Sequence, residues 1–512
     1  MNPEPPLSPG PARPSPGQFA TVIPAAPGRA PTDGRLPHPK EDSAEGTIGD
    51  APRGTDGGIP LARALGFALL GVMAFHLAHA MSQLAFLLLL FHGGMAAMSL
   101  VRTRRRAFYP TLAVGLAVYA PHLAFFWTIF GPPAVLLWLV LAFWLALFVV
   151  LAWFVRSRLG TRWWLATLPV LWTGLEYFRS ELYHLRFSWL NSGYALSESP
   201  QAHWLLWPGM FGAGFVLMSI VAFALGRRGR KGWFIGFGAT AALAGLINLP
   251  ATTSARDAAD RVLRVAGIQA EFPIETDVPR LLDKALARFP DAELFVLSEY
   301  TFEKPVPEPV RDWCRRHSKH LIVGGKEPIA DNFYNTAFVV DPTGEIVFKQ
   351  VKSVPIQFFA DGLPAPEQAV WESPWGKLAI PTCYDLSYTR VIDRMIARGA
   401  EAIINPTMDM AEWGAYQHAL HSRVPKVRAA EHDVPIFRVA SSGISQLVNA
   451  RGVVEATAPF PGDEAVIGGE LRLAGAGRIP LDRWLAPACT IASGLLFVGA
   501  FVPALRRKGD PK

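Results

Sequence analysis

Three side chains that could carry out nucleophilic chemistry each follow a strand-like apolar run. They are Glu299 after Leu294–Leu297, Lys352 after Ile346–Val351 and Cys383 after Leu378–Ile380. A deprotonated thiol is a strong nucleophile, and a partly buried carboxylate is a suitable general base. An ammonium group stabilises both a thiolate and an oxyanion. Together, these three residue types indicate covalent catalysis by a cysteine.

The position of Cys383 supports this interpretation. It lies where a buried strand turns into a helix, at the edge where α/β sheets usually place their sites, and the dipole of a helix N-terminus lowers a thiol pKa. The alternative is a structural cysteine, because cysteine is among the most often buried residue types. Glu299 and Lys352 could each be a strand end that turns polar at the surface. The occurrence of all three at strand ends favours catalysis.

The stretch that contains these residues, 252–483, has an ordinary composition and alternates strand-like with helical runs, which predicts an α/β domain. The expected strands are the three runs above with Val262–Ile268, Leu321–Gly324, Thr336–Val340, Ala402–Ile404, Ile436–Ala440 and Val466–Leu471. The expected helices are Val278–Arg288, Pro309–His317, Thr389–Arg398 and Tyr416–Glu431.

The rest of the chain is unusually apolar. The 512-residue protein is 51% hydrophobic and 18% charged, whereas soluble chains carry about 25% charged residues, so a purely soluble protein is excluded. A helix needs about 20 apolar residues to cross a bilayer. The sequence predicts eight such spans, at Leu61–Ala80, Leu84–Leu100, Phe108–Trp127, Ala134–Val155, Trp163–Phe178, Trp204–Leu225, Trp233–Leu249 and Trp484–Val502.

The basic residues of this half indicate its orientation. Residues 61–250 contain 14 Arg or Lys and three acidic residues, and the cations gather in alternate links between spans. Because Lys and Arg are retained on the cytoplasmic side of short loops, both termini are expected in the cytoplasm of a multi-pass protein. The α/β domain is then periplasmic if the membrane is a bacterial inner membrane. The cations lie between apolar runs, which favours the membrane over nucleic acid as their partner.

Five segments follow from these patterns. Residues 1–60 hold 14 Pro and nine Gly, which predicts a disordered cytoplasmic tail. The others are a seven-helix transmembrane domain at 61–250, a periplasmic catalytic domain at 251–483, an eighth transmembrane helix at 484–505 and a basic cytoplasmic tail at 506–512.

Several motifs resemble a known family. The order Glu299, Lys352, Cys383 is similar to the Glu-Lys-Cys triad of the nitrilase (carbon-nitrogen hydrolase) superfamily, and residues 374–385 around the cysteine resemble its nucleophile motif. A domain of this kind between seven spans and one span resembles the bacterial apolipoprotein N-acyltransferases. The runs Leu168–Arg179 and Phe187–Tyr194 are similar to that family's fifth span and external loop.

The resemblance implies an αββα sandwich and a two-step acyl transfer. Glu299 would take the proton of Cys383, whose sulfur would attack an acyl ester of a phospholipid, while Lys352 and the backbone N–H of Tyr384 would hold the oxyanion. The thioester would then pass its acyl chain to the α-amine of a diacylglyceryl-cysteine lipoprotein. No metal or organic cofactor and no nucleic acid is implied, and we expect a monomer in the membrane.

One stretch departs from the family. The family's lysine is usually followed by His-Leu-Val-Pro-Phe-Gly-Glu, whereas residues 353–361 read Ser-Val-Pro-Ile-Gln-Phe-Phe-Ala-Asp. Asp361 is the candidate replacement for the family's second glutamate, and Asp385 replaces the glutamate that usually follows the Cys-Tyr pair. With Tyr384 and Trp413, which lies beside Gly414 in an expected mobile loop, these are the expected substrate-binding residues. The departure leaves a membrane-anchored amidase as the alternative function.

Two further interpretations are weaker. A lipid-binding or scaffold protein with a decayed site is opposed by the intact Glu299, Lys352 and Cys383. His418 and His421 stand three residues apart on an expected helix and could bind a metal. Because no nearby acid or cysteine completes a ligand set, a packed or solvated helix face is favoured.

Overall fold

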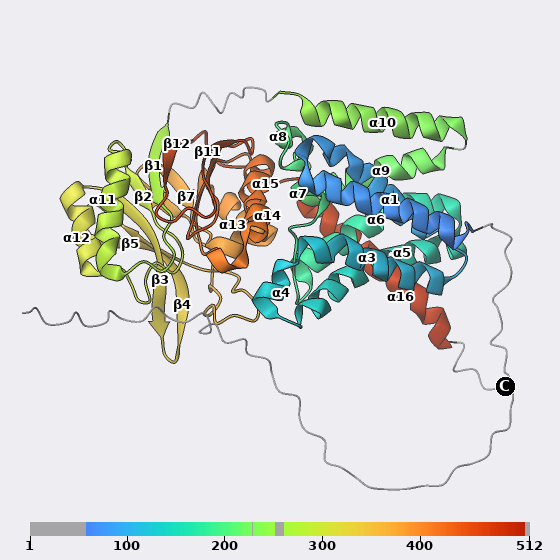
Figure 1. Ribbon diagram of the computed structural model, residues 1–512, viewed down its shortest axis with the longest axis horizontal. Helices are drawn as coiled ribbons and strands as arrows, with labels where there is room; N and C mark the ends of the chain where they lie inside the picture. The colour runs from blue at the N-terminus through green and yellow to red at the C-terminus, as the bar shows by residue number, and fades with distance from the viewer. Residues whose placement is uncertain (1–57, 228, 251–260, 507–512) are drawn as a thin grey trace, which may run out of the picture.

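The computed structural model describes residues 58–227, 229–250 and 261–506, with side chains to residue 500. The expected disordered tail, the link 251–260 and most of the basic C-terminal tail lie outside the described residues. Figure 1 shows a helical part and an α/β part side by side, with the last helix, α16 (Asp482–Arg506), returning from the α/β part into the helical part.

Two six-stranded sheets form the centre of the α/β part. The first has the order β12-β1-β2-β3-β4-β5, and the second β11-β10-β9-β8-β7-β6. The strands of the first sheet are β1 (Val262–Ile268), β2 (Leu294–Val296), β3 (His320–Ile329), β4 (Asn332–Val340), β5 (Ile346–Val351) and β12 (Val466–Arg472). Those of the second are β6 (Trp371–Ser373), β7 (Gly376–Ala379), β8 (Ala402–Thr407), β9 (Ile436–Ala440), β10 (Ser445–Val448) and β11 (Val454–Ala458).

The sheets face each other across a buried apolar layer. Val265, Ile322 and Val339 of the first sheet pack with Ile404 and Val439 of the second. On the outer side of the first sheet lie α11 (Val278–Arg288) and α12 (Glu308–His317), and on that of the second lie α13 (Thr389–Ala397) and α15 (Arg423–His432). The domain is therefore a four-layer α-β-β-α sandwich, as the resemblance implied.

Each strand expected from the sequence overlaps a strand of the structure. The strands β6, β10 and β11 were not expected. β6 and β11 are the two edges of their sheet, and such short strands depend on the neighbouring strand rather than on an apolar run of their own. The prediction of a single helix at Tyr416–Glu431 was wrong. It is divided at Ser422 into α14 (Ala415–His421) and α15, because the ring of Pro425 is incompatible with the carbonyl of His421 in a continuous helix.

Each predicted span overlaps a helix of the helical part. These helices are α1 (Leu61–Ala80), η1 (Ser82–Leu87) with α2 (Leu88–Met98), α3 (Arg104–His122) with α4 (Phe125–Phe130), α5 (Ala134–Leu159), α6 (Thr161–Tyr177), α9 (Met210–Gly226), α10 (Arg230–Asn248) and α16. Among the described residues, three helices are long and apolar enough to cross a membrane, at 61–80, 134–159 and 482–500. The segments 82–98 and 210–226 are apolar but shorter, so the count of eight spans stays a prediction.

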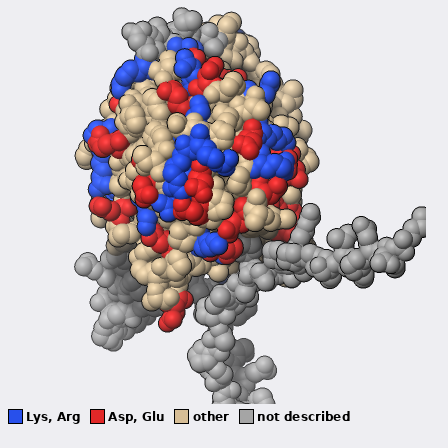
Figure 2. Space-filling view, turned by 90° about the vertical axis from the view of Figure 1, so that its left-hand side faces the viewer, with Lys and Arg blue, Asp and Glu red and all other residues tan. Residues whose placement is uncertain are grey.

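The surfaces of the two parts differ in polarity. Figure 2 shows acidic and basic side chains interspersed over the end of the α/β part that faces away from the helices. The ion pairs of this part include Arg280–Glu464 and Lys326–Glu303. By contrast, Trp233, Phe234 and Phe237 of α10 are each more than 70% exposed. An apolar helix face of this kind is suited to lipid and the mixed-charge face is suited to water.

The helical part is attached to the second sheet's helices by buried hydrogen bonds. At the N-terminus of α9, the backbone N–H of Met210 donates to Glu431 Oε2 (3.0 Å), and that of Phe211 donates to Asp482 Oδ2 (2.9 Å). Two carboxylates from outside α9 thus accept from backbone N–H groups that have no partner within the first turn of that helix. This fixes the sandwich with its second sheet towards the helical part, and Cys383 follows β7 of that sheet.

Candidate active site

The structure brings Glu299 and Lys352 together at the edge of the first sheet. Glu299 lies shortly after β2 and Lys352 directly after β5, and both side chains are about 1% exposed. Lys352 Nζ lies 2.8 Å from Glu299 Oε1. β2 and β5 are separated by β3 and β4 in the sheet, so the pair is formed by strands distant in sequence. The fold thus brings two of the three predicted catalytic residues into direct contact.

Asp361 is the second partner of the same lysine. Its Oδ2 lies 2.8 Å from Lys352 Nζ and accepts from the Ile356 N–H at 2.7 Å. Its Oδ1 accepts from the Tyr300 hydroxyl at 2.6 Å and from the Asn335 amide at 3.0 Å. Asp361 was expected to contact substrate. With both of its oxygens already held, its contacts are those of a counter-ion that holds the lysine and the loop after it.

Cys383 occupies a turn between β7 and the outer helices. It is the first residue of η5 (Cys383–Ser387) and has a φ of +49°, a strained conformation for a residue with a Cβ that is typical of functional turns. Its Sγ lies 3.5 Å from the carbonyl oxygen of Met408, whose own N–H donates to Glu299 Oε2 at 2.7 Å. One backbone unit, Met408, therefore connects the thiol and the carboxylate.

The electrostatics of these groups follow from their burial. Burial raises the pKa of Glu299, an effect that Lys352 opposes. Burial also raises the pKa of the Cys383 thiol, Glu299 adds to that rise, and Lys352 opposes it. The sequence suggested that a helix N-terminus would lower the thiol pKa. That was wrong for the resting site because desolvation outweighs a five-residue turn, so the thiol is protonated beside a carboxylate that can accept its proton.

Lys352 keeps its charge despite its environment. Burial alone would lower its pKa, but Asp361 and Glu299 outweigh that effect and hold the pKa well above its ordinary value. A buried ammonium with two carboxylates is compensated in charge and remains a fixed donor. The site therefore contains a permanent cation next to a carboxylate and a thiol that share one proton.

Asp385, which was expected to bind substrate, is used to hold the nucleophile turn. Its carboxylate accepts from the N–H groups of Ser353 (2.9 and 3.0 Å), Val354 (2.7 Å) and Thr382 (3.3 Å). These bonds attach the segment after Lys352 to the turn that carries Cys383. Asp385 is fully buried, and burial raises its pKa to about 7 although the backbone donors oppose the rise.

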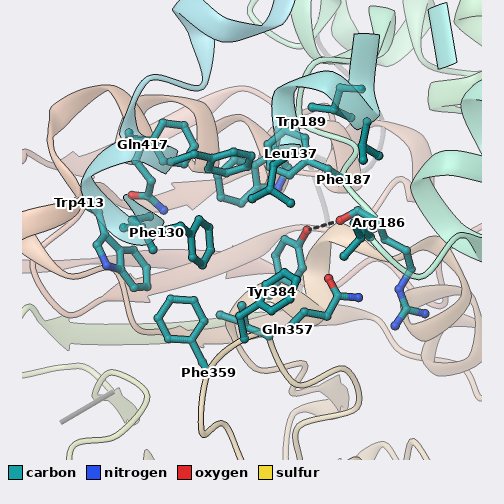
Figure 3. Close-up of a pocket in the computed structure, with 18 residues that line it drawn as sticks. Phe130, Leu137, Arg186, Phe187, Trp189, Gln357, Phe359, Tyr384, Trp413 and Gln417 are labelled. Carbon is teal, nitrogen blue, oxygen red and sulfur yellow. Dashed lines mark hydrogen bonds between the residues drawn. The ribbon is translucent and has the colours of Figure 1, made fainter. Parts of the chain in front are cut away.

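Trp413 and Tyr384 line a large apolar pocket between the two parts of the molecule (Figure 3). The pocket has about 810 Å³ of empty volume, and its walls come from α4, α5, the loop 185–189 and the segment 356–359. A smaller pocket of about 360 Å³ is lined by Glu299, Lys352 and Asp361, and Ile356, Phe359 and Trp413 belong to both. The apolar pocket thus adjoins the carboxylate–lysine pair.

His418 and His421 belong to a buried network rather than to a solvated helix face. Asp409 accepts from His421 Nδ1 at 2.7 Å and also pairs with Arg438, while His418 Nε2 lies 3.0 Å from the carbonyl of Met410. Among the described residues, no group of three or more His, Cys, Asp or Glu is arranged to hold a metal ion. The network fixes the segment after β8, which contains Met408.

Comparison with protein families covers both parts of the molecule. Residues 65–223 match the apolipoprotein N-acyltransferase N-terminal domain, and residues 285–480 match the carbon-nitrogen hydrolase family. In both parts the chain is similar to the apolipoprotein N-acyltransferases.

Individual relatives are distant but extend over most of the chain. The chain is 25% identical over 460 residues to the apolipoprotein N-acyltransferase of Geobacter metallireducens, covering 78% of this chain and 87% of that protein. It is 24% identical over 376 residues to that of Methylococcus capsulatus, covering 65% and 73%. A carbon-nitrogen hydrolase from Helicobacter pylori matches 48% of this chain with 94% of its own, with a TM-score of 0.36 and 19% identity.

Three parts of the candidate site were missed from the sequence. They are Asn335, which donates to both Glu299 Oε1 (2.6 Å) and Asp361 Oδ1, the hydroxyl of Tyr300, and the backbone of Met408. Asn335 had a usable signal, because an amide beside the apolar run Thr336–Val340 must find partners when buried. The Met408 main chain had none, since a backbone contact leaves no mark on the residue type.

Proposed function

We propose that this protein is an apolipoprotein N-acyltransferase that moves an acyl chain from a phospholipid, through a thioester on Cys383, to the N-terminal amine of a diacylglyceryl-cysteine lipoprotein. The observation that carries the proposal is the apolar pocket shared by the helical part and the α/β part, which adjoins Glu299 and Lys352. A soluble amide has no need of such a pocket. A fatty acyl chain does, because burial of each methylene group contributes about 0.8 kcal/mol.

In the first step, Glu299 accepts the thiol proton as the sulfur of Cys383 attacks the carbonyl carbon of the phospholipid ester. The S–C bond forms, and the oxyanion is held by the ammonium of Lys352 and the N–H of Tyr384. Collapse of this intermediate breaks the C–O ester bond. The leaving alkoxide takes the proton from Glu299 and departs as a lysophospholipid, leaving the acyl group as a thioester.

In the second step, the α-amine of the lipoprotein attacks the thioester carbonyl and gives its proton to Glu299. The N–C bond forms, the C–S bond breaks, and the thiolate regains the proton from Glu299. Water competes with the amine for the thioester. The aromatic walls of the pocket, including Phe126, Phe130 and Phe359 (Figure 3), limit this loss because they keep water from the acyl chain.

The membrane arrangement is part of the proposal. It comprises eight spans, with a seven-helix domain at 61–250, a catalytic domain at 251–483 on the periplasmic side of a bacterial inner membrane, and a last span at 484–505. It is supported by the alternation of basic links and by the exposed apolar face of α10. Both substrates are lipids, so a site between spans and catalytic domain can receive them sideways from the bilayer.

Reporter fusions check this orientation. A reporter joined after Lys231 is expected to be active only in the cytoplasm, because this residue belongs to the basic run at the start of α10. A reporter inserted between residues 474 and 478, next to the first residues of α16, is expected to be active only in the periplasm. The reverse pattern would overturn the orientation.

One transfer assay separates this function from the amidase alternative. Purified protein is incubated with phosphatidylethanolamine and a diacylated lipopeptide, and the products are followed by mass spectrometry. We expect a triacylated lipopeptide and an equal amount of lysophosphatidylethanolamine. Ammonia release from simple amides without any triacylated product would show an amidase instead.

A further inference from the structure

The apolar pocket contains a single cationic side chain, Arg186. Of the residues that line the pocket, most are aromatic or aliphatic, and the polar exceptions with long side chains are Arg186, Gln357 and Gln417. Figure 3 shows Arg186 and Gln357 at the same end of the pocket, below and beside Tyr384, and Gln417 at the other end beside Trp413. The pocket therefore has one positively charged end.

Arg186 has no counter-ion within the described residues. No carboxylate there lies within 4.0 Å of its guanidinium, whereas the neighbouring Arg179 of the same external link pairs with Glu176. Nε of Arg186 is buried and makes no hydrogen bond. Its Cζ lies 5.2 Å from the ring centroid of Tyr388, so the guanidinium is supported by an aromatic face but its Nε–H remains to be satisfied.

A partly buried guanidinium without an acid is costly unless a ligand supplies the anion. The planar fork of arginine matches the oxygens of a phosphate in a two-point contact. The reacting group of the acceptor is an amine, which offers a guanidinium no anion, whereas the donor brings a phosphodiester. The anion that this end of the pocket fits is therefore the phosphate of the donor.

The position of Arg186 relative to the nucleophile agrees with this assignment. Its carbonyl oxygen accepts from the hydroxyl of Tyr384 at 3.2 Å, and Tyr384 directly follows Cys383. In a glycerophospholipid the ester carbonyls are separated from the phosphorus by only a few bonds. The hydrogen bond to Tyr384 therefore joins the charged end of the pocket to the turn that carries Cys383.

We propose that Arg186 binds the phosphodiester of the acyl-donor phospholipid and thereby selects the donor in the first half of the reaction. The proposal rests on the proposed acyl transfer. It assigns Arg186 to formation of the thioester, with no direct role in the attack by the amine, because the phosphate leaves with the lysophospholipid.

The test compares two donors of the same fatty acid, phosphatidylethanolamine and a phosphate-free p-nitrophenyl ester, in a maltoside detergent. kcat/KM for acylation of the enzyme is measured from release of lysophospholipid or p-nitrophenol. In Arg186→Gln, we expect the ratio of the phospholipid value to the ester value to fall about 10- to 100-fold, as for loss of a charge-assisted hydrogen bond. Arg186→Lys keeps the charge but lacks the planar fork of arginine. Its ratio is expected to lie between that of the unmodified protein and that of Arg186→Gln.

Arg390 provides a matched control. Its Cζ lies 5.5 Å from the ring centroid of the same Tyr388, but it does not line the pocket. Arg390→Gln therefore loses the same kind of aromatic contact without affecting the proposed phosphate site, and its ratio is expected to equal that of the unmodified protein.

Two results would overturn the proposal. The first is an unchanged ratio in Arg186→Gln, and the second is an equal fall of the ratio in Arg390→Gln. Failure of the unmodified protein to acylate a lipopeptide would instead contradict the proposed function, so the two failures are distinguishable.

Discussion

Replacement of Cys383 by alanine is expected to abolish acyl transfer and the covalent intermediate together. Without the thiol there is no atom to hold the acyl group between donor and acceptor, and removal of a nucleophile lowers turnover by on the order of 10⁶-fold. Intact-protein mass spectrometry after incubation with phospholipid alone is expected to find the acyl adduct on the unmodified protein and none on the variant.

Cys314 is the matched control for this experiment. It is a second buried cysteine of the same domain, but it packs in α12 beneath the first sheet, on the side away from the helical part. Cys314→Ala is expected to keep the acyl adduct and the transfer reaction. Turnover by Cys383→Ala, or an acyl adduct that persists in it, would contradict catalysis through Cys383.

Replacement of Lys352 by methionine is expected to reduce both catalysis and stability. Glu299 and Asp361, which are 1% and 5% exposed, would lose their shared cation. Removal of one member of a buried ion pair costs about 3–5 kcal/mol of unfolding free energy. The rate is expected to fall by about 10²–10³-fold because the oxyanion loses a fixed donor. Thermal unfolding in detergent and the transfer assay measure the two effects.

A double variant separates charge balance from catalysis. In Lys352→Met with Asp361→Asn, one buried carboxylate is removed together with the cation, so a large part of the lost stability is expected to return. Activity is not expected to return, because the oxyanion still lacks its ammonium group. Recovery of activity in the double variant would show that Lys352 serves the fold alone.

The resemblance to the family left open whether Asp361 replaces the family's second glutamate. The run after Lys352 departs from the usual family motif, and the departure raised an amidase as an alternative. In the structure Asp361 lies 2.8 Å from Lys352 Nζ, as Glu299 does, and it also accepts from Tyr300 and Asn335. The unusual run therefore still supplies an acid to the lysine, by contacts that depend on the path of the loop.

The sequence by itself predicted the candidate catalytic residues and determined the alternation of strands and helices. Glu299, Lys352 and Cys383 were recognisable because polar groups at the ends of apolar strands are local features. The α/β character of one part and the apolar helices of the other followed from periodicity and composition for the same reason, whereas the α-β-β-α layering was implied by the family resemblance.

The tertiary structure alone decided how these groups are held. Asp385 as an anchor of the nucleophile turn, Met408 as the link between thiol and carboxylate, and Arg186 at the charged end of an apolar pocket all arise from contacts between segments distant in the chain. Such contacts depend on the packing of one element against another and on the burial that results. Neither is encoded in the spacing of residues along a single strand or helix.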